Sequence, residues 1–152
     1  MLNAQDYTLL VVEDDWMLRN LMAMDLRHQG YKVHTAECGN QALEVLNKNK
    51  IDLIVSDVRM PNGDGLSLLD QIRAKDPQHP GLLFVTGHSE VSDRECCARG
   101  ALQVLAKPFE RQALRDTVNY WVETLAEKRP RATKLPAVIA NANLPSRGSL
   151  SS

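Results

Sequence analysis

Mostly apolar segments alternate with segments of helical periodicity over the first 128 residues. The apolar segments are rich in residue types that favour strands, and they span 7–12, 31–36, 51–56, 81–86 and 101–106. Apolar residues three or four positions apart predict amphipathic helices over 16–29, 39–50, 66–75, 89–99 and 110–128. The pattern therefore predicts five consecutive βα units.

The predicted strands carry apolar residues without a regular polar alternation. Strands of this kind are covered on both faces, which indicates an α/β fold with a doubly wound parallel sheet and helices on both sides. Open sheets of this class bind ligands at the carboxyl ends of their strands. For the first helix, Asp15 is the predicted N-cap and Gly30 the predicted C-cap.

Composition limits the classes of function. The chain has 152 residues and a formal net charge of -1, which suits one domain and gives no basic excess for direct nucleic-acid binding by this segment. No apolar run approaches the roughly 20 residues of a membrane span. We therefore expect no membrane partner. The three cysteines form neither a metal-ligand pattern nor a disulfide framework, so we expect a cytoplasmic setting.

The composition changes after Lys128. We expect residues 1–128 to form the domain and residues 129–152, which contain three prolines, to be a linker or flexible C-terminal tail. Within that tail, residues 135–140 are an apolar patch that could dock, although a solvated tail is the stronger expectation.

Chemically useful side chains stand at the predicted carboxyl ends of four strands. Glu13 and Asp14 follow the first strand, Asp57 the third, Thr86 ends the fourth and Lys107 follows the fifth. Carboxylates that meet at one rim favour a hard cation such as Mg²⁺. A carboxylate can also be a phosphoryl acceptor, while a lysine and a hydroxyl can contact phosphoryl oxygens. The set predicts phosphoryl-transfer chemistry.

Four motifs then carry a resemblance to a known family. They are Val-Val-Glu-Asp-Asp at 11–15, Ser-Asp-Val-Arg-Met-Pro at 56–61 with glycines at 63 and 65, Phe-Val-Thr-Gly at 84–87, and Ala-Lys-Pro-Phe at 106–109. In this order, each at a strand end, they resemble the receiver domain of two-component response regulators. The resemblance covers residues 7 to about 128 and implies the flavodoxin-like strand order 2-1-3-4-5.

The resemblance also implies roles. Asp57 is expected to be the phosphoacceptor and a Mg²⁺ ligand, with Asp14 a direct ligand, Glu13 acting through water, and the backbone carbonyl of Arg59 completing the protein ligands. Thr86 is expected to be the switch hydroxyl, and Lys107 the partner of the phosphoryl group. Asp15 is an alternative member of the acid pair, disfavoured because it is placed to cap the helix.

The implied partners are a histidine kinase or histidine phosphotransfer protein as donor and a downstream effector or a missing output domain. The implied output face consists of the last two helices and the last strand, through which a homodimer is a further expectation. Such a protein is a signalling phosphoacceptor and not an enzyme, assisting only its own phosphorylation and dephosphorylation.

One position departs from the family pattern. Family members usually carry an aromatic residue three positions before the lysine, and here that position is Val104. Val104 is the only support for an alternative, a receiver-like interaction module that does not use phosphorylation, and the intact acid cluster, Thr86 and Lys107 argue against it. A third hypothesis, an aspartate-nucleophile phosphohydrolase, ranks last because Arg59 stands where those enzymes generally place a second aspartate. Arg59 and His88 occupy the family's tuning positions, and we expect Arg59 to lengthen the phosphorylated lifetime.

Overall fold

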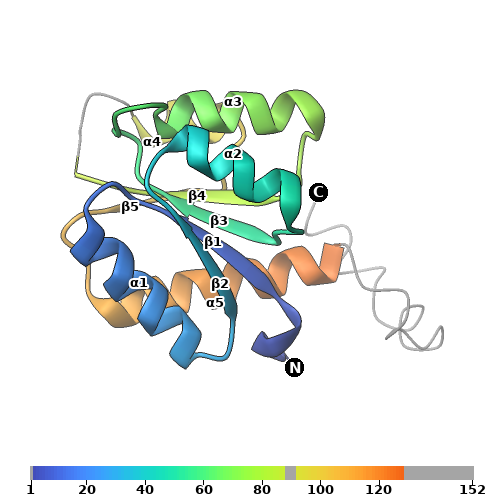
Figure 1. The fold of residues 1–152 in the computed structure, drawn as a ribbon. Helices are drawn as coiled ribbons and strands as arrows, with labels where there is room; N and C mark the ends of the chain where they lie inside the picture. Colours follow the sequence, from blue (N-terminus) through green and yellow to red (C-terminus); the bar gives the residue numbers. More distant parts are fainter. Residues whose placement is uncertain (1, 88–91, 129–152) are drawn as a thin grey trace.

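The computed structural model describes residues 2–87 and 92–128 (Figure 1). Five strands form one sheet in the order β2-β1-β3-β4-β5, and every neighbouring pair is parallel. The strands are β1 Thr8–Val12, β2 Lys32–Ala36, β3 Leu53–Ser56, β4 Gly81–Thr86 and β5 Gln103–Ala106. The predicted α/β class and the strand order 2-1-3-4-5 are confirmed.

Within the described residues, five α-helices connect and follow the strands, after a short 3-10 helix at Ala4–Asp6 that the sequence pattern did not predict. They are α1 Trp16–His28, α2 Gly39–Lys48, α3 Gly65–Lys75, α4 Asp93–Ala98 and α5 Arg111–Lys128. In Figure 1, α2, α3 and α4 cover one face of the sheet, and α1 and α5 cover the other.

Two apolar cores result, because successive strand residues point to opposite faces. Leu10 and Ile54 belong to the core beneath α2, α3 and α4, whereas their neighbours Leu9 and Val55 belong to the core above α1 and α5. Phe84 is fully buried in the first core. Burial on both faces explains the continuous apolar strands of the sequence.

Local signals set most element ends. The Asp15 carboxylate accepts the N–H groups of Met17 and Leu18, which confirms the predicted N-cap of α1. The C-cap of α1 is Gln29, one residue before the predicted Gly30, which follows it with a φ of 107°, a left-handed conformation that favours glycine.

Several predicted boundaries were too early, among them β5, which begins at Gln103 and not at residue 101. Strand β3 begins at Leu53 and not at residue 51, although the Asp52 backbone still donates to the Thr8 carbonyl at 2.8 Å and accepts from the Gly81 N–H at 3.3 Å. Helix α4 begins at Asp93, where the Ser92 hydroxyl accepts the Glu95 N–H. The predicted start at Ser89 lies outside the described residues, as does the tail 129–152. Across the described residues, we find no helix long and apolar enough to cross a membrane.

Candidate functional site: an acidic rim at the strand ends

Three carboxylates meet at the carboxyl ends of β1 and β3. Glu13, Asp14 and Asp57 each offer an oxygen within 4.8 Å of the others. Glu13 and Asp57 are 1% and 4% exposed, whereas Asp14 faces solvent. Asp15 is not part of this group, since its carboxylate caps α1. The structure therefore brings together the acidic residues that the sequence singled out.

The Asp57 backbone is fixed as an extension of the sheet. Its N–H donates to the Val12 carbonyl at 3.0 Å, which aligns the ends of β3 and β1. Its carboxylate is held on both sides, with Oδ1 accepting the Val58 N–H at 2.7 Å and Oδ2 accepting from Lys107 Nζ at 3.0 Å. The contribution of Val58 was missed, because a backbone donor leaves no mark in residue type.

Lys107 connects the acids to the far side of the sheet. Its backbone N–H donates to the Thr86 carbonyl at 2.9 Å, extending the β4–β5 pairing by one residue. Its Nζ lies 2.9 Å from Glu13 Oε1 as well as 3.0 Å from Asp57 Oδ2. One ammonium group thus bridges carboxylates that lie 44 positions apart in the sequence.

Burial and charge set the electrostatics of this cluster. Burial raises the pKa of the Glu13 carboxyl, against the opposing effect of its hydrogen bond to Lys107. Burial lowers the pKa of Lys107, but its hydrogen bonds to Glu13 and Asp57 outweigh that effect and leave the pKa above its ordinary value. Lysine is therefore held as a cation between the two acids.

The donor set suits Mg²⁺. Three carboxylates against one bound ammonium leave a net negative charge, and Mg²⁺ binds through one or two carboxylates with waters and phosphate oxygens. Arg59 lies two residues after Asp57 in the loop before α3, with an exposed side chain. The role of its carbonyl as a ligand stays a prediction.

The remaining predicted residues lie around the rim or outside the description. Thr86 ends β4 and is 7% exposed. Val104 pairs with Phe84 across β4 and β5 and packs against the core that contains Phe84. His88 lies outside the described residues.

Comparison with known proteins agrees with the resemblance found in the sequence motifs. The chain matches the model of the response regulator receiver domain over residues 9–119. It is 36% identical over 119 residues to the transcriptional regulatory protein GlrR of Escherichia coli (strain K12), an alignment that covers 78% of this chain and 27% of GlrR. It is also 36% identical over 125 residues to the sensor histidine kinase RcsC of Salmonella typhi, covering 82% of this chain and 13% of RcsC.

Solved structures agree with this placement. The receiver domain of the Francisella response regulator 1452 superposes with a TM-score of 0.72 at 27% identity, covering 78% of this chain and 98% of that one. The receiver domain of NtrX from Brucella abortus gives 0.71 at 29% identity, covering 76% and 98%. The chain belongs to the response regulator receiver domain family. It spans about a quarter, or less, of the length of the curated relatives named above.

Proposed function

We propose that this receiver domain accepts a phosphoryl group on Asp57 from a phosphohistidine donor in the presence of Mg²⁺, and that phosphorylation changes a partner-binding face. The observation that carries the proposal is the Lys107 ammonium, which bonds Asp57 and Glu13 at the point where three carboxylates meet. A turn or capping role for Asp57 would not require this arrangement.

The chemical step is a phosphoryl transfer between two side chains. A carboxylate oxygen of Asp57 forms a P–O bond while the P–N bond of the donor phosphohistidine breaks, and the imidazole nitrogen leaves with the bonding electron pair. The Val58 N–H and Lys107 hold the carboxylate in position for the attack. Lys107 also supplies positive charge for an oxygen of the transferred group.

Glu13, Asp14 and Asp57 would hold the metal, with the Arg59 carbonyl as the further protein ligand. Bound Mg²⁺ supplies charge that offsets the negative oxygens of the entering phosphoryl group and the acceptor. The residues of the chain provide the site, and Glu13 is kept buried behind Lys107.

Output follows from contacts that favour one of two states. The phosphoryl group would draw the Thr86 hydroxyl and Lys107 toward it, and both residues stand at the ends of neighbouring strands, β4 and β5. The face made by α4, β5 and α5 would then change its affinity for a downstream effector, an output domain or a second copy. The phosphohistidine donor, the downstream partner and a cytoplasmic location are parts of this proposal. We also propose that the domain assists only its own phosphorylation and dephosphorylation.

A phosphorylation-independent interaction module is the second candidate, supported by Val104. This side chain is smaller than the aromatic residue usual at its position and packs against the core. Binding of a beryllofluoride mimic separates the two candidates. The leading proposal predicts Mg²⁺-dependent binding with spectral changes at Thr86 and on β5, whereas the alternative predicts none.

Transfer from a donor tests the leading proposal. A histidine phosphotransfer protein carrying labelled phosphate should pass the label to the wild-type chain with Mg²⁺ but not with a chelator. Asp57→Asn should receive no label. Asp64→Asn is the matched control, because it lies in the same loop and asparagine caps α3 as well as aspartate does. Label on Asp57→Asn equal to that on Asp64→Asn would contradict the proposal.

A further inference from the structure

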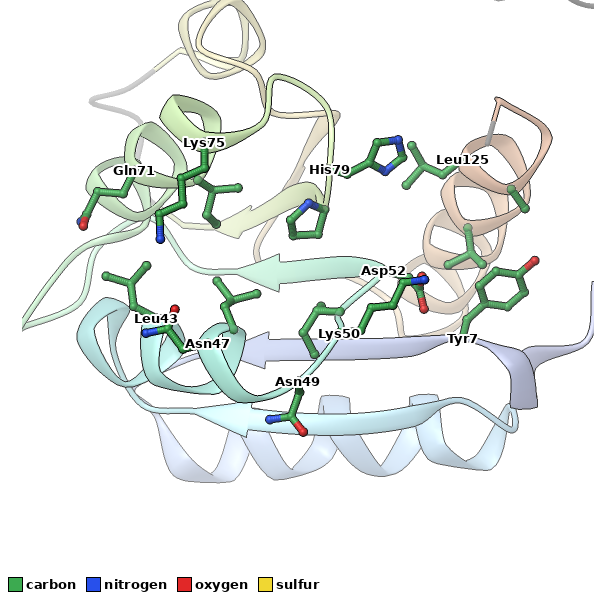
Figure 2. A pocket seen from close by; sticks show the side chains of 16 residues that line it. Tyr7, Leu43, Asn47, Asn49, Lys50, Asp52, Gln71, Lys75, His79 and Leu125 are labelled. Atoms are coloured by element: carbon green, nitrogen blue, oxygen red, sulfur yellow. The ribbon is translucent and has the colours of Figure 1, made fainter. Parts of the chain in front are cut away.

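A cavity of about 480 Å³ lies at the amino ends of the strands, opposite the acidic rim. Tyr7, Asp52 and Pro80, which each precede a strand, form part of its wall. Figure 2 shows Leu43 and Asn47 of α2 and Gln71 and Lys75 of α3 on one side, with Leu125 of α5 and Tyr7 on the other. We call this cavity the basal groove. It is of the size that holds small ligands or a few apolar side chains.

The basal groove has an apolar floor and a polar mouth. Apolar side chains from three helices and from the segment before β3 line it: Leu43, Leu46, Ile51, Ile72, Val122 and Leu125. Lys50 and Lys75 are exposed at the mouth. Asp52, the only carboxylate among the described lining residues, already accepts the Thr8 N–H. An uncharged, apolar occupant therefore fits better than a charged one. The two lysines are exposed to solvent and the Asp52 carboxylate is already hydrogen-bonded, so a charge buried on the apolar floor would not be compensated.

The sequence contains a segment of this chemistry shortly after α5. Val122, Leu125 and Ala126 of α5 form one wall, and α5 ends at Lys128. The run Leu-Pro-Ala-Val-Ile-Ala at 135–140 begins seven residues later and contains no charged side chain. Seven extended residues reach up to about 23 Å, which is ample for a groove whose wall is the last turns of the preceding helix.

We propose that residues 135–140 of the C-terminal segment dock in the basal groove of the same molecule. The short connection of 129–134 gives the run an effective concentration on the order of millimolar, so modest apolar contacts suffice to hold it. Leu135, Val138 and Ile139 bring the branched side chains that fill an apolar floor. Asn47, Asn49 and Gln71 also line the groove. The amides of Asn49 and Gln71 already donate to the Val45 carbonyl and the Ser67 hydroxyl, and the remaining amide oxygens and N–H groups can bond the backbone of an extended segment.

Docking at this place leaves the acidic rim open, because the two sites lie at opposite ends of the strands. The proposal is thus independent of phosphorylation at Asp57. In this proposal the segment after α5 binds to the domain that precedes it, and this binding sets the direction in which the chain continues beyond residue 140.

Nuclear magnetic resonance of the full chain tests the proposal. The amide NH₂ groups of Asn47, Asn49 and Gln71 give probes among the residues that line the groove. We compare wild type with the double variant Val138→Asp/Ile139→Asp, and with Leu144→Asp as the control for a new charge in the same segment. The substitutions lie beyond α5, so the folded domain is retained in each variant.

The double variant should shift these amide resonances by more than a line width relative to wild type, while Leu144→Asp leaves them in place. The wild-type shifts should not depend on protein concentration. Identical groove resonances in wild type and the double variant would overturn the proposal. So would shifts that appear only on raising the concentration, since a second copy would then be the occupant, or equal shifts in Leu144→Asp.

Discussion

Gly65 is the residue where a single methyl group should disturb both the fold and the site. It opens α3, and its N–H donates to the Val58 carbonyl at 2.7 Å, closing the loop that carries Asp57. A Cβ added here would lie 2.2 Å from the Asp57 carbonyl oxygen and 2.7 Å from Cε1 of Phe84. One neighbour is backbone and the other is fully buried, so neither can move away freely.

The magnitude follows from this overlap. Relief requires the loop to shift by about 1 Å, and overpacking of this kind costs roughly 1–3 kcal/mol. We take the upper end, about 3 kcal/mol, because two fixed neighbours are struck. Alanine also restricts the unfolded chain and returns about 0.4–1 kcal/mol, leaving a net loss of about 2 kcal/mol for Gly65→Ala. A shift of this size at the Asp57 backbone should slow phosphorylation by about 100-fold.

Urea unfolding of Gly65→Ala and Gly87→Ala provides the assay. Gly87 also borders the site, but among the described residues a Cβ there meets only Lys107 Cβ at 3.8 Å, an ordinary contact. Gly87→Ala should therefore unfold within about 0.5 kcal/mol of wild type. If Gly65→Ala were as stable as Gly87→Ala and accepted phosphate at the same rate, the close approach would not be what positions Asp57.

Three other perturbations address separate features. Asp25→Asn should lose about 1–2 kcal/mol of unfolding free energy in urea at pH 7, because the buried Asp25 carboxylate accepts a hydrogen bond from the charged Arg111. Asp70→Asn should lose under about 1 kcal/mol, because Asp70 and its partner Arg99 form an exposed ion pair. The hydrogen bond from Arg111 lowers the pKa of Asp25 in the folded protein. The stabilisation by Asp25 is therefore present above its unfolded pKa near 4, and it should vanish as the pH falls through its lowered folded pKa. A stability difference between wild type and Asp25→Asn that stays constant down to about pH 2 would contradict this. Asp14→Asn should weaken Mg²⁺ binding at least tenfold in calorimetric titration and Asp15→Asn should not, since only Asp14 belongs to the carboxylate group. Arg59→Ala should shorten the phosphorylated lifetime, measured by loss of label, and an unchanged rate would exclude a shielding role.

The order of elements could be predicted because burial on both sheet faces leaves continuous apolar strands. Element ends were harder because backbone hydrogen bonds continue past them. Asp52 precedes β3 yet still bonds Thr8 and Gly81 through its backbone, so the apolar pattern does not mark Leu53 as the first strand residue. Ser92 caps α4 at a point that several polar residues in the same stretch could equally have marked.

The acidic rim could be predicted because parallel strands present their carboxyl ends at one edge, so that residue type and strand position sufficed. The groups that position it could not. The Val58 N–H is a backbone donor, and the close approach at Gly65 depends on the exact path of a loop.

Away from the rim, the hydrogen bond between Asp25 of α1 and Arg111 of α5 could not be predicted either. It joins residues 86 positions apart, and no local sequence pattern contains such a pairing.

Intact-protein mass spectrometry tests the central claim most directly. The wild-type chain and Asp57→Asn are incubated with acetyl phosphate, each with Mg²⁺ and with a chelator. The account predicts one added phosphoryl group on the wild type with Mg²⁺, and none in the other three samples. An equal adduct on Asp57→Asn, or none on the wild type with Mg²⁺, would contradict the assignment of Asp57 as the acceptor.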